Sequence, residues 1–108
     1  MYNIPIKALS ANQMYLGRKV KSAAYRKYEK QMAFLLPDID LPDPPYKLVM
    51  KFGLSSSLAD LDNSLKAFID TLQTKYGFND RDIFEIVASK TKTKKGEEFI
   101  IWDITSVS

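Results

Sequence analysis

The stretch YKLVMKFGLSSSLADLDNSLKAFIDTLQTKYG, residues 46–77, decides the fold because it joins a strand pattern to a helix pattern. Over residues 46–53 the apolar side chains alternate with the intervening ones, which is the period of two expected for a half-buried strand. The alternating positions are Tyr46, Leu48, Met50 and Phe52. Residues 54–59 are predicted to form a polar loop that leads into a helix.

The second half of this stretch has the periodicity of a helix with one buried face. Its apolar positions are Leu61, Leu65, Phe68 or Ile69, and Leu72. The pattern ends near Tyr76 and Gly77, and glycine is suited to the left-handed C-cap of a helix. The sequence therefore predicts a helix of about four turns after the strand.

The N-terminal part is predicted to contribute one more strand and one more helix. Residues 2–8 are typical of a strand in which Pro5 requires an edge position or an irregularity, and residues 10–21 are predicted to be a loop. Ser22 has the side chain of an N-cap for a helix that stops before Pro37. Its apolar positions are Tyr25, Tyr28, Met32 and Leu35 or Leu36. A proline-rich connector, residues 37–45, follows.

The C-terminal part is predicted to form two strands. Residues 83–90 are rich in strand-forming side chains, and residues 99–104 form a second such run after a turn at Gly96. We expect these two strands to pair as an antiparallel hairpin. The predicted order is β-α-β-α-β-β, an α/β class with a mixed α+β sheet, in a single small domain that covers residues 1–108.

Composition excludes several kinds of chemistry. The 108 residues contain no Cys and no His, which removes disulfides, thiolate nucleophiles, Ser-His-Asp triads and the commonest transition-metal ligand. Carboxylate, lysine and metal chemistry remain available. The chain has no apolar run of membrane-spanning length and no signal-peptide pattern at MYNIPIKALS, so we expect a cytoplasmic protein without a membrane partner.

Charge is distributed unevenly along the chain. Residues 1–36 hold seven Lys or Arg and one Glu, a formal charge of +6, and the remaining residues carry −3, for a net charge of +3. A basic arm beside an acidic site suits a polyanion that is held by its phosphates. A solvated surface with uneven charge is the alternative interpretation.

Two carboxylates stand at the start of the second predicted helix. Asp60 and Asp62 lie two residues apart, so an extended backbone would direct both side chains to one side. Lys66 follows Asp62 by one helical turn, and Asp70 continues that row. Helix capping explains one acidic residue at such a position, whereas this segment has two carboxylates and Asn63.

A second acidic pair, Asp80 and Asp82, follows the same helix and precedes a strand. Turn chemistry is the simpler explanation, because Asp side chains bond the local backbone in turns. The two pairs start at opposite ends of the helix, about 20 Å apart. They meet only if the strands fold back or if another subunit contributes, and the sequence leaves both possibilities open.

The block DLDNSLKAFIDTL, residues 60–72, with the NDRDIFEI that follows, resembles the RusA family of Holliday junction resolvases. That family's core reads D-x-D-N-x-x-K-x-x-x-D-x-L, and each of its polar positions is present here in register. The resemblance covers about residues 46–104. In the N-terminal part, SANQMY (residues 10–15) resembles the family's asparagine-containing segment, and SAAYRKYEKQM (residues 22–32) resembles its first helix.

The resemblance implies an endodeoxyribonuclease that acts as a homodimer on four-way DNA junctions and cuts them by paired symmetric nicks. It implies a Mg²⁺ cofactor, for which Mn²⁺ is expected to substitute. Recombination, repair, and the debranching of phage genomes would all use such an enzyme. A non-catalytic junction-binding dimer and a metal-stabilised interaction module are the alternative functions.

By position, the resemblance assigns Asp60, Asp62, Lys66 and Asp80 as catalytic residues, with the three aspartates as metal ligands. Asp82 is the alternate third ligand, since a shift of the alignment exchanges it with Asp80. The chain departs from the family where an aspartate is usual at residue 79 and a glutamine at residue 82. It also has SSSLA, residues 55–59, where relatives often carry arginines, so phosphate contacts must come from elsewhere.

Basic residues in three segments are candidates for contact with DNA backbones. They are Arg18, Lys19, Lys21, Arg26, Lys27, Lys30, Lys90, Lys92, Lys94 and Lys95. Alternation would direct Lys90, Lys92 and Lys94 to one side if the strand continues through them. A solvated hairpin is the alternative interpretation of that last run.

Overall fold

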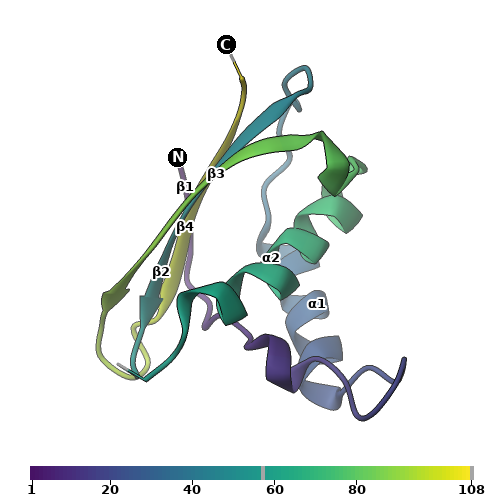
Figure 1. Ribbon diagram of the computed structural model, residues 1–108. Helices are drawn as coiled ribbons and strands as arrows, with labels where there is room; N and C mark the ends of the chain where they lie inside the picture. The colour runs from purple at the N-terminus through teal and green to yellow at the C-terminus, as the bar shows by residue number, and fades with distance from the viewer. Residues whose placement is uncertain (57, 108) are drawn as a thin grey trace.

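Four strands form one mixed sheet, and two helices lie on one face of it in the computed structural model (Figure 1). The structure describes residues 1–56 and 58–107; Ser57, in the predicted loop 54–59, and Ser108 lie outside the described residues. The elements are β1 (Tyr2–Ile4), the 3-10 helix η1 (Ala11–Gln13), α1 (Ala23–Leu35), β2 (Tyr46–Leu54), α2 (Leu61–Tyr76), the 3-10 helix η2 (Asp80–Asp82), β3 (Ile83–Lys92) and β4 (Phe99–Ser106). The expected α+β class with a mixed sheet in one domain is confirmed.

The strand order in the sheet is β1-β4-β2-β3. Strand β2 pairs with β3 in parallel and with β4 in antiparallel orientation. The predicted hairpin of residues 83–90 with residues 99–104 is therefore wrong, because β2 lies between these strands. The connection passes over the end of β2, where the Thr93 backbone N–H donates to the Leu54 carbonyl at 2.9 Å.

Burial explains why β4 and β3 do not pair. The β4 residues Ile100, Trp102 and Ile104 are all buried, so this strand gains most from a central position covered by the helices. No residue of β3 is buried, and the strand exposes most of its length. The more polar strand accordingly takes the edge of the sheet.

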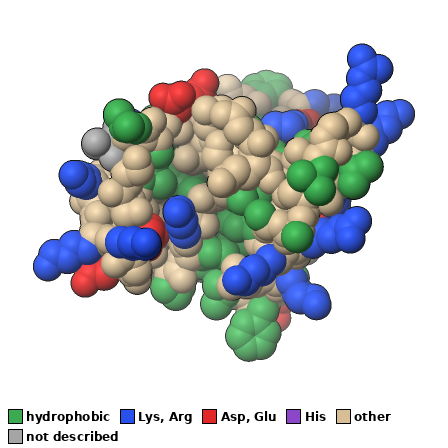
Figure 2. All heavy atoms as spheres, turned by 90° about the horizontal axis from the view of Figure 1, so that it is seen from below, with side chains coloured by type: hydrophobic (Ala, Val, Ile, Leu, Met, Phe, Trp, Pro, Cys, Tyr) green, Lys and Arg blue, Asp and Glu red, His purple; other side chains and the backbone are tan. Residues whose placement is uncertain are grey.

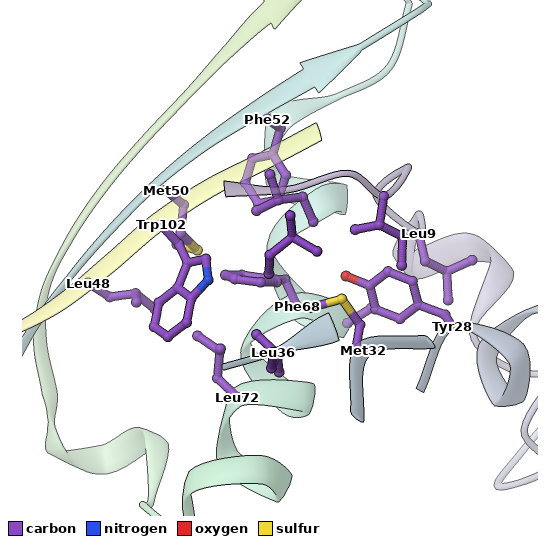
Figure 3. Close-up of a cluster of buried hydrophobic side chains, with 14 of the residues drawn as sticks. Leu9, Tyr28, Met32, Leu36, Leu48, Met50, Phe52, Phe68, Leu72 and Trp102 are labelled. Carbon is purple, nitrogen blue, oxygen red and sulfur yellow. The ribbon is translucent and has the colours of Figure 1, made fainter. Parts of the chain in front are cut away.

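The core lies between α2, α1 and the sheet (Figure 3). The Phe68 ring on α2 packs edge-on against both Phe52 and Trp102, with centroids 6.0 Å from each. On the predicted stripe of this helix Phe68 and Leu72 are buried, whereas Leu61 and Leu65 are only partly buried. These contacts hold α2 along the strands that it crosses.

The caps and chain breaks follow the local chemistry. The Ser22 side chain accepts from the Tyr25 backbone N–H at 3.0 Å and caps α1, and Gly77 ends α2 with a left-handed φ of 73°. Strand β1 ends at Ile4, directly before Pro5, and is shorter than the predicted strand 2–8. The predicted loop 10–21 contains η1, which the sequence pattern did not indicate.

The β2-α2-β3 unit determines where the acidic residues lie. Because β2 and β3 are parallel, α2 must return the chain from the end of β2 to the start of β3. The start of α2 and the ends of β2 and β3 lie together at the lower left of Figure 1. Neither helix in the described part of the chain is long and apolar enough to cross a membrane.

Two tyrosines, the buried Tyr28 and the partly buried Tyr76, make the fold sensitive to alkali. Burial raises the pKa of Tyr76 to about 12, with smaller contributions from Tyr2 and Asp38. Burial, with Tyr25 beside it, also raises the pKa of Tyr28 above its usual value of 10.0. Their stabilisation is complete below the unfolded pKa and is lost as the pH rises through the folded pKa.

We therefore expect the free energy of unfolding to fall as the pH rises above about 10, and to fall less steeply in Tyr28→Phe. The Tyr28 hydroxyl has no hydrogen-bond partner among the described residues, so this variant should stay within about 1 kcal/mol of the parent at neutral pH. Urea unfolding at several pH values measures both quantities. Equal pH slopes in the two proteins would contradict the prediction.

Candidate functional site

Asp60 occupies the N-cap position of α2 without acting as a side-chain cap. Its backbone is extended, with φ −76° and ψ 136°, and its carboxylate makes no capping hydrogen bond. Its Oδ2 is 3.4 Å from the donating side-chain nitrogen of Asn63. The capping explanation for this acidic residue is therefore not supported, and the exposed carboxylate is available for a ligand.

Asp62 lies in the first turn of α2, so the extended backbone that would align it with Asp60 stops short of it. Its Oδ1 accepts from the Asn63 backbone N–H at 3.0 Å. Lys66 is exposed one turn later, and among the described residues it forms no ion pair. Asp70 has a structural contact, because its carboxylate accepts from the Tyr25 hydroxyl at 3.3 Å.

The second acidic pair lies at the opposite end of α2, in η2. Asn79 supplies the turn contact, since its side chain accepts from the Arg81 backbone N–H at 3.0 Å. The Asp80 and Asp82 carboxylates accept no hydrogen bond from the described residues. The pair thus contributes no carboxylate to the turn, contrary to the turn explanation.

One chain does not bring the two acidic pairs together. The 16 residues of α2 span about 24 Å at the rise of an α-helix. Within residues 1–56 and 58–107, no group of three acidic side chains is close enough to hold a metal ion. The sequence left open two ways for the acidic pairs to meet. The strands of one chain do not bring them together, so contribution by another subunit is the possibility that remains.

A hollow of about 430 Å³ with a mixed polar and apolar lining adjoins Asp60. Its lining comes from the chain after β1, from η1, from the connection between β2 and α2 and from the first turn of α2, and it includes Lys7, Asn12, Gln13, Ser55, Asp60 and Asn63. Lys7 and Gln13 were not singled out by the sequence. For the Gln13 segment the sequence offered one signal, the resemblance of SANQMY to a family segment. The hollow could not be predicted from the sequence, because it forms only when η1 packs against α2.

Two contacts hold the wall of this hollow. The Lys90 ammonium group at the end of β3 donates to the Ala59 carbonyl at 2.7 Å, directly before Asp60. The Ser55 hydroxyl donates to Glu98 at 2.8 Å. Backbone hydrogen bonds at Glu98 and this hydroxyl hold the pKa of the Glu98 carboxyl below its usual range. The end of β3 is therefore tied to the start of the acidic motif.

The predicted DNA-contacting residues come from the loop before α1, from α1, and from the end of β3 with the turn that follows it. Seen from below, Lys and Arg side chains project on both sides of the molecule (Figure 2). Lys21 is already paired with Glu29 at 3.0 Å. Lys90 and Lys92 are the register partners of Phe52 and Leu54 on β2, so both lysines lie on one side of the sheet, but β3 ends at Lys92. The condition for alternation through Lys94, a strand that continues to that residue, is therefore not met.

Strand β3 exposes apolar side chains along a sheet edge. Phe84 is 72% exposed, Ile86 45% and Val87 47%. Strand β3 pairs with β2 on one side, and its opposite side is an edge of the sheet because β3 is the last strand in the order. A long exposed edge with apolar side chains is a ready surface for pairing with another strand.

Comparisons of the chain with protein-family models and with curated proteins found no match. The resemblance to the RusA family therefore rests on the motif and its spacing.

We expect the two N-caps to respond differently to truncation. Ser22→Ala should lower the free energy of unfolding by about 1 kcal/mol, because the Tyr25 N–H loses its partner. Asp60→Ala should cost at most about 0.5 kcal/mol, as is usual at exposed positions without such a bond. Urea unfolding of both variants measures the difference. Equal losses would assign Asp60 a capping role after all.

Proposed function

We propose that this chain is a Mg²⁺-dependent endodeoxyribonuclease that resolves four-way DNA junctions as a homodimer. The observation that carries the proposal is the position of the two acidic pairs at opposite ends of α2 and β3, with the Lys90 end of β3 bonded beside Asp60. One chain offers half of a carboxylate site at each end. A second copy supplies the missing half.

The exposed β3 edge supports the geometry of this dimer. In a two-fold dimer that pairs β3 with its copy, the two strands run antiparallel. The start of the partner's β3, with Asp80 and Asp82, then lies beside the Lys90 end of the first copy. That end is next to Asp60, so an acidic residue from each subunit meets there.

Side-chain chemistry along β3 favours the same pairing. The exposed Phe84, Ile86 and Val87 would be covered by the second strand. A partner strand would also satisfy the backbone N–H and C=O groups along the unpaired side of β3, which is an edge of the sheet.

The donor set fits a hard cation when two subunits are combined. Asp60 and Asp62 of one subunit with Asp80 or Asp82 of the other would provide the carboxylate oxygens that Mg²⁺ prefers. When bound there, the ion supplies Lewis-acid chemistry for phosphodiester hydrolysis. Mn²⁺ takes the same oxygen ligands and should substitute.

The remaining side chains have separate tasks. Lys66 would neutralise charge that develops on the scissile phosphate, because it is exposed one turn from Asp62 and forms no ion pair among the described residues. Asn63 orients the Asp60 carboxylate by its 3.4 Å contact. The basic segments hold the DNA arms, and a junction with near two-fold symmetry presents two equivalent strands to the two sites.

We expect Asp62→Asn to bind a synthetic four-way junction and to lose its Mg²⁺-dependent nicking. The substitution preserves shape but removes a ligand charge, so the loss should reach about 100-fold or more. Asp70→Asn is the matched control, because Asp70 lies on the same helix as Asp62 but contacts Tyr25 of α1, and this variant should retain most nicking. A gel assay with and without Mg²⁺ measures both.

Undiminished nicking by Asp62→Asn would refute the assignment. Junction binding without any cut by the parent protein would favour the non-catalytic dimer. Mg²⁺ binding without junction affinity would favour the interaction module.

Subunit mixing tests the shared site. Neither Asp60→Asn/Asp62→Asn nor Asp80→Asn/Asp82→Asn should nick a junction alone. A mixed dimer contains one intact site and one doubly substituted site, so random mixing should restore about a quarter of the parental sites. Mixing that restores no nicking, with subunit exchange verified by differently tagged chains, would overturn the shared site.

A further inference from the structure

The hollow beside Asp60 has a lining that the proposed hydrolysis does not use. Apart from Asp60 and Asn63, its polar groups are hydroxyls, two carboxamides and one ammonium group, and its apolar groups are aliphatic. The carboxamides belong to Asn12 and Gln13, and the ammonium group to Lys7. This mixture differs from the carboxylates that would bind a cation.

The two carboxamides are carried on a fixed support and are free to bind. Ser10 caps η1, with its hydroxyl oxygen 3.3 Å from the Asn12 backbone nitrogen. Met14, which follows the turn, is fully buried and anchors it to the core. Within the described part of the chain, the Asn12 and Gln13 carboxamides have no hydrogen-bond partner, and both residues are exposed.

The chemistry of the hollow matches a nucleobase better than a phosphate. A carboxamide presents one acceptor and two donors, which is the pattern that pairs with base edges. Leu54, Leu58 and Ala59 offer aliphatic contact to the faces of a ring. A phosphate would instead face the Asp60 carboxylate with only Lys7 to balance its charge. A volume of about 430 Å³ lies in the range of small-molecule sites.

We propose that this hollow binds the unpaired base of the nucleotide next to the cleaved phosphate, and that Asn12 and Gln13 set the base preference. This inference rests on the proposed function, because Asp60 places the hollow beside the site of cleavage. Bases near the crossover of a junction can leave the stack at low cost, and proteins read such bases on their hydrogen-bonding edges.

Nick mapping tests the proposal with four junctions that differ only in the base at this position. The parent protein should prefer one base by about tenfold or more, as expected for a carboxamide that reads a base. In Asn12→Ala and Gln13→Ala the preferred junction should be cut more slowly and the preference should fall to about threefold or less. Gln31→Ala, an exposed carboxamide on α1, is the matched control and should keep the parental preference.

A second measurement does not require cleavage. With 2-aminopurine at the same position, binding of Asp62→Asn should raise the fluorescence as the base leaves the stack, and adding Gln13→Ala should abolish that rise. Circular dichroism verifies that each variant is folded.

The outcomes separate the two proposals. Nicking with no base preference, or a preference that Asn12→Ala and Gln13→Ala both retain, overturns the base subsite and leaves the nuclease intact. No nicking by the parent overturns the nuclease. In that case an unchanged 2-aminopurine signal on binding overturns the subsite as well.

Discussion

The parallel pairing of β2 with β3, joined by α2, is the constraint on which the rest of the structure depends. A parallel pair requires a crossover, and α2 serves as that crossover because Phe68 and Leu72 are buried against the sheet. The crossover separates residues that are close in sequence. It places Asp60 at one end of the unit and Asp80 at the other, and no local adjustment of side chains can bring them together.

In the proposed dimer, this separation gives the edge of the sheet a functional role. Strand β3 has a sheet neighbour on one side only, and it exposes apolar residues at Phe84, Ile86 and Val87. Native proteins usually protect such an edge, so its exposure in one chain is consistent with a partner strand. In the proposed dimer a single interaction covers the apolar edge and completes the carboxylate set. Dimerisation and catalysis would then depend on the same strand.

The sequence anticipated part of the candidate site. The spacing of Asp60, Asp62 and Lys66 indicated a polar site at a helix start, and the structure places these residues there with the Asp60 carboxylate uninvolved in capping. The contribution of η1 was not predictable, because Asn12 and Gln13 reach the site through packing between segments about 50 residues apart. The hairpin prediction was wrong because a short connection permits either direct pairing of two strands or passage over a strand between them. Local residues do not distinguish these two arrangements.

Local chemistry by itself determined the helices, their caps and the strand character of the central residues. The helix ends depend on residues that act on the adjacent backbone, namely Ser22, Pro37 and Gly77. Alternation along β2 indicates which side of the strand is buried. Both signals come from neighbouring residues and can therefore be recognised in the sequence. Strand order, the location of the edge and the assembly of the hollow were decided by tertiary structure alone. They depend on which apolar surfaces compete for the few central positions, and that competition involves the whole chain at once.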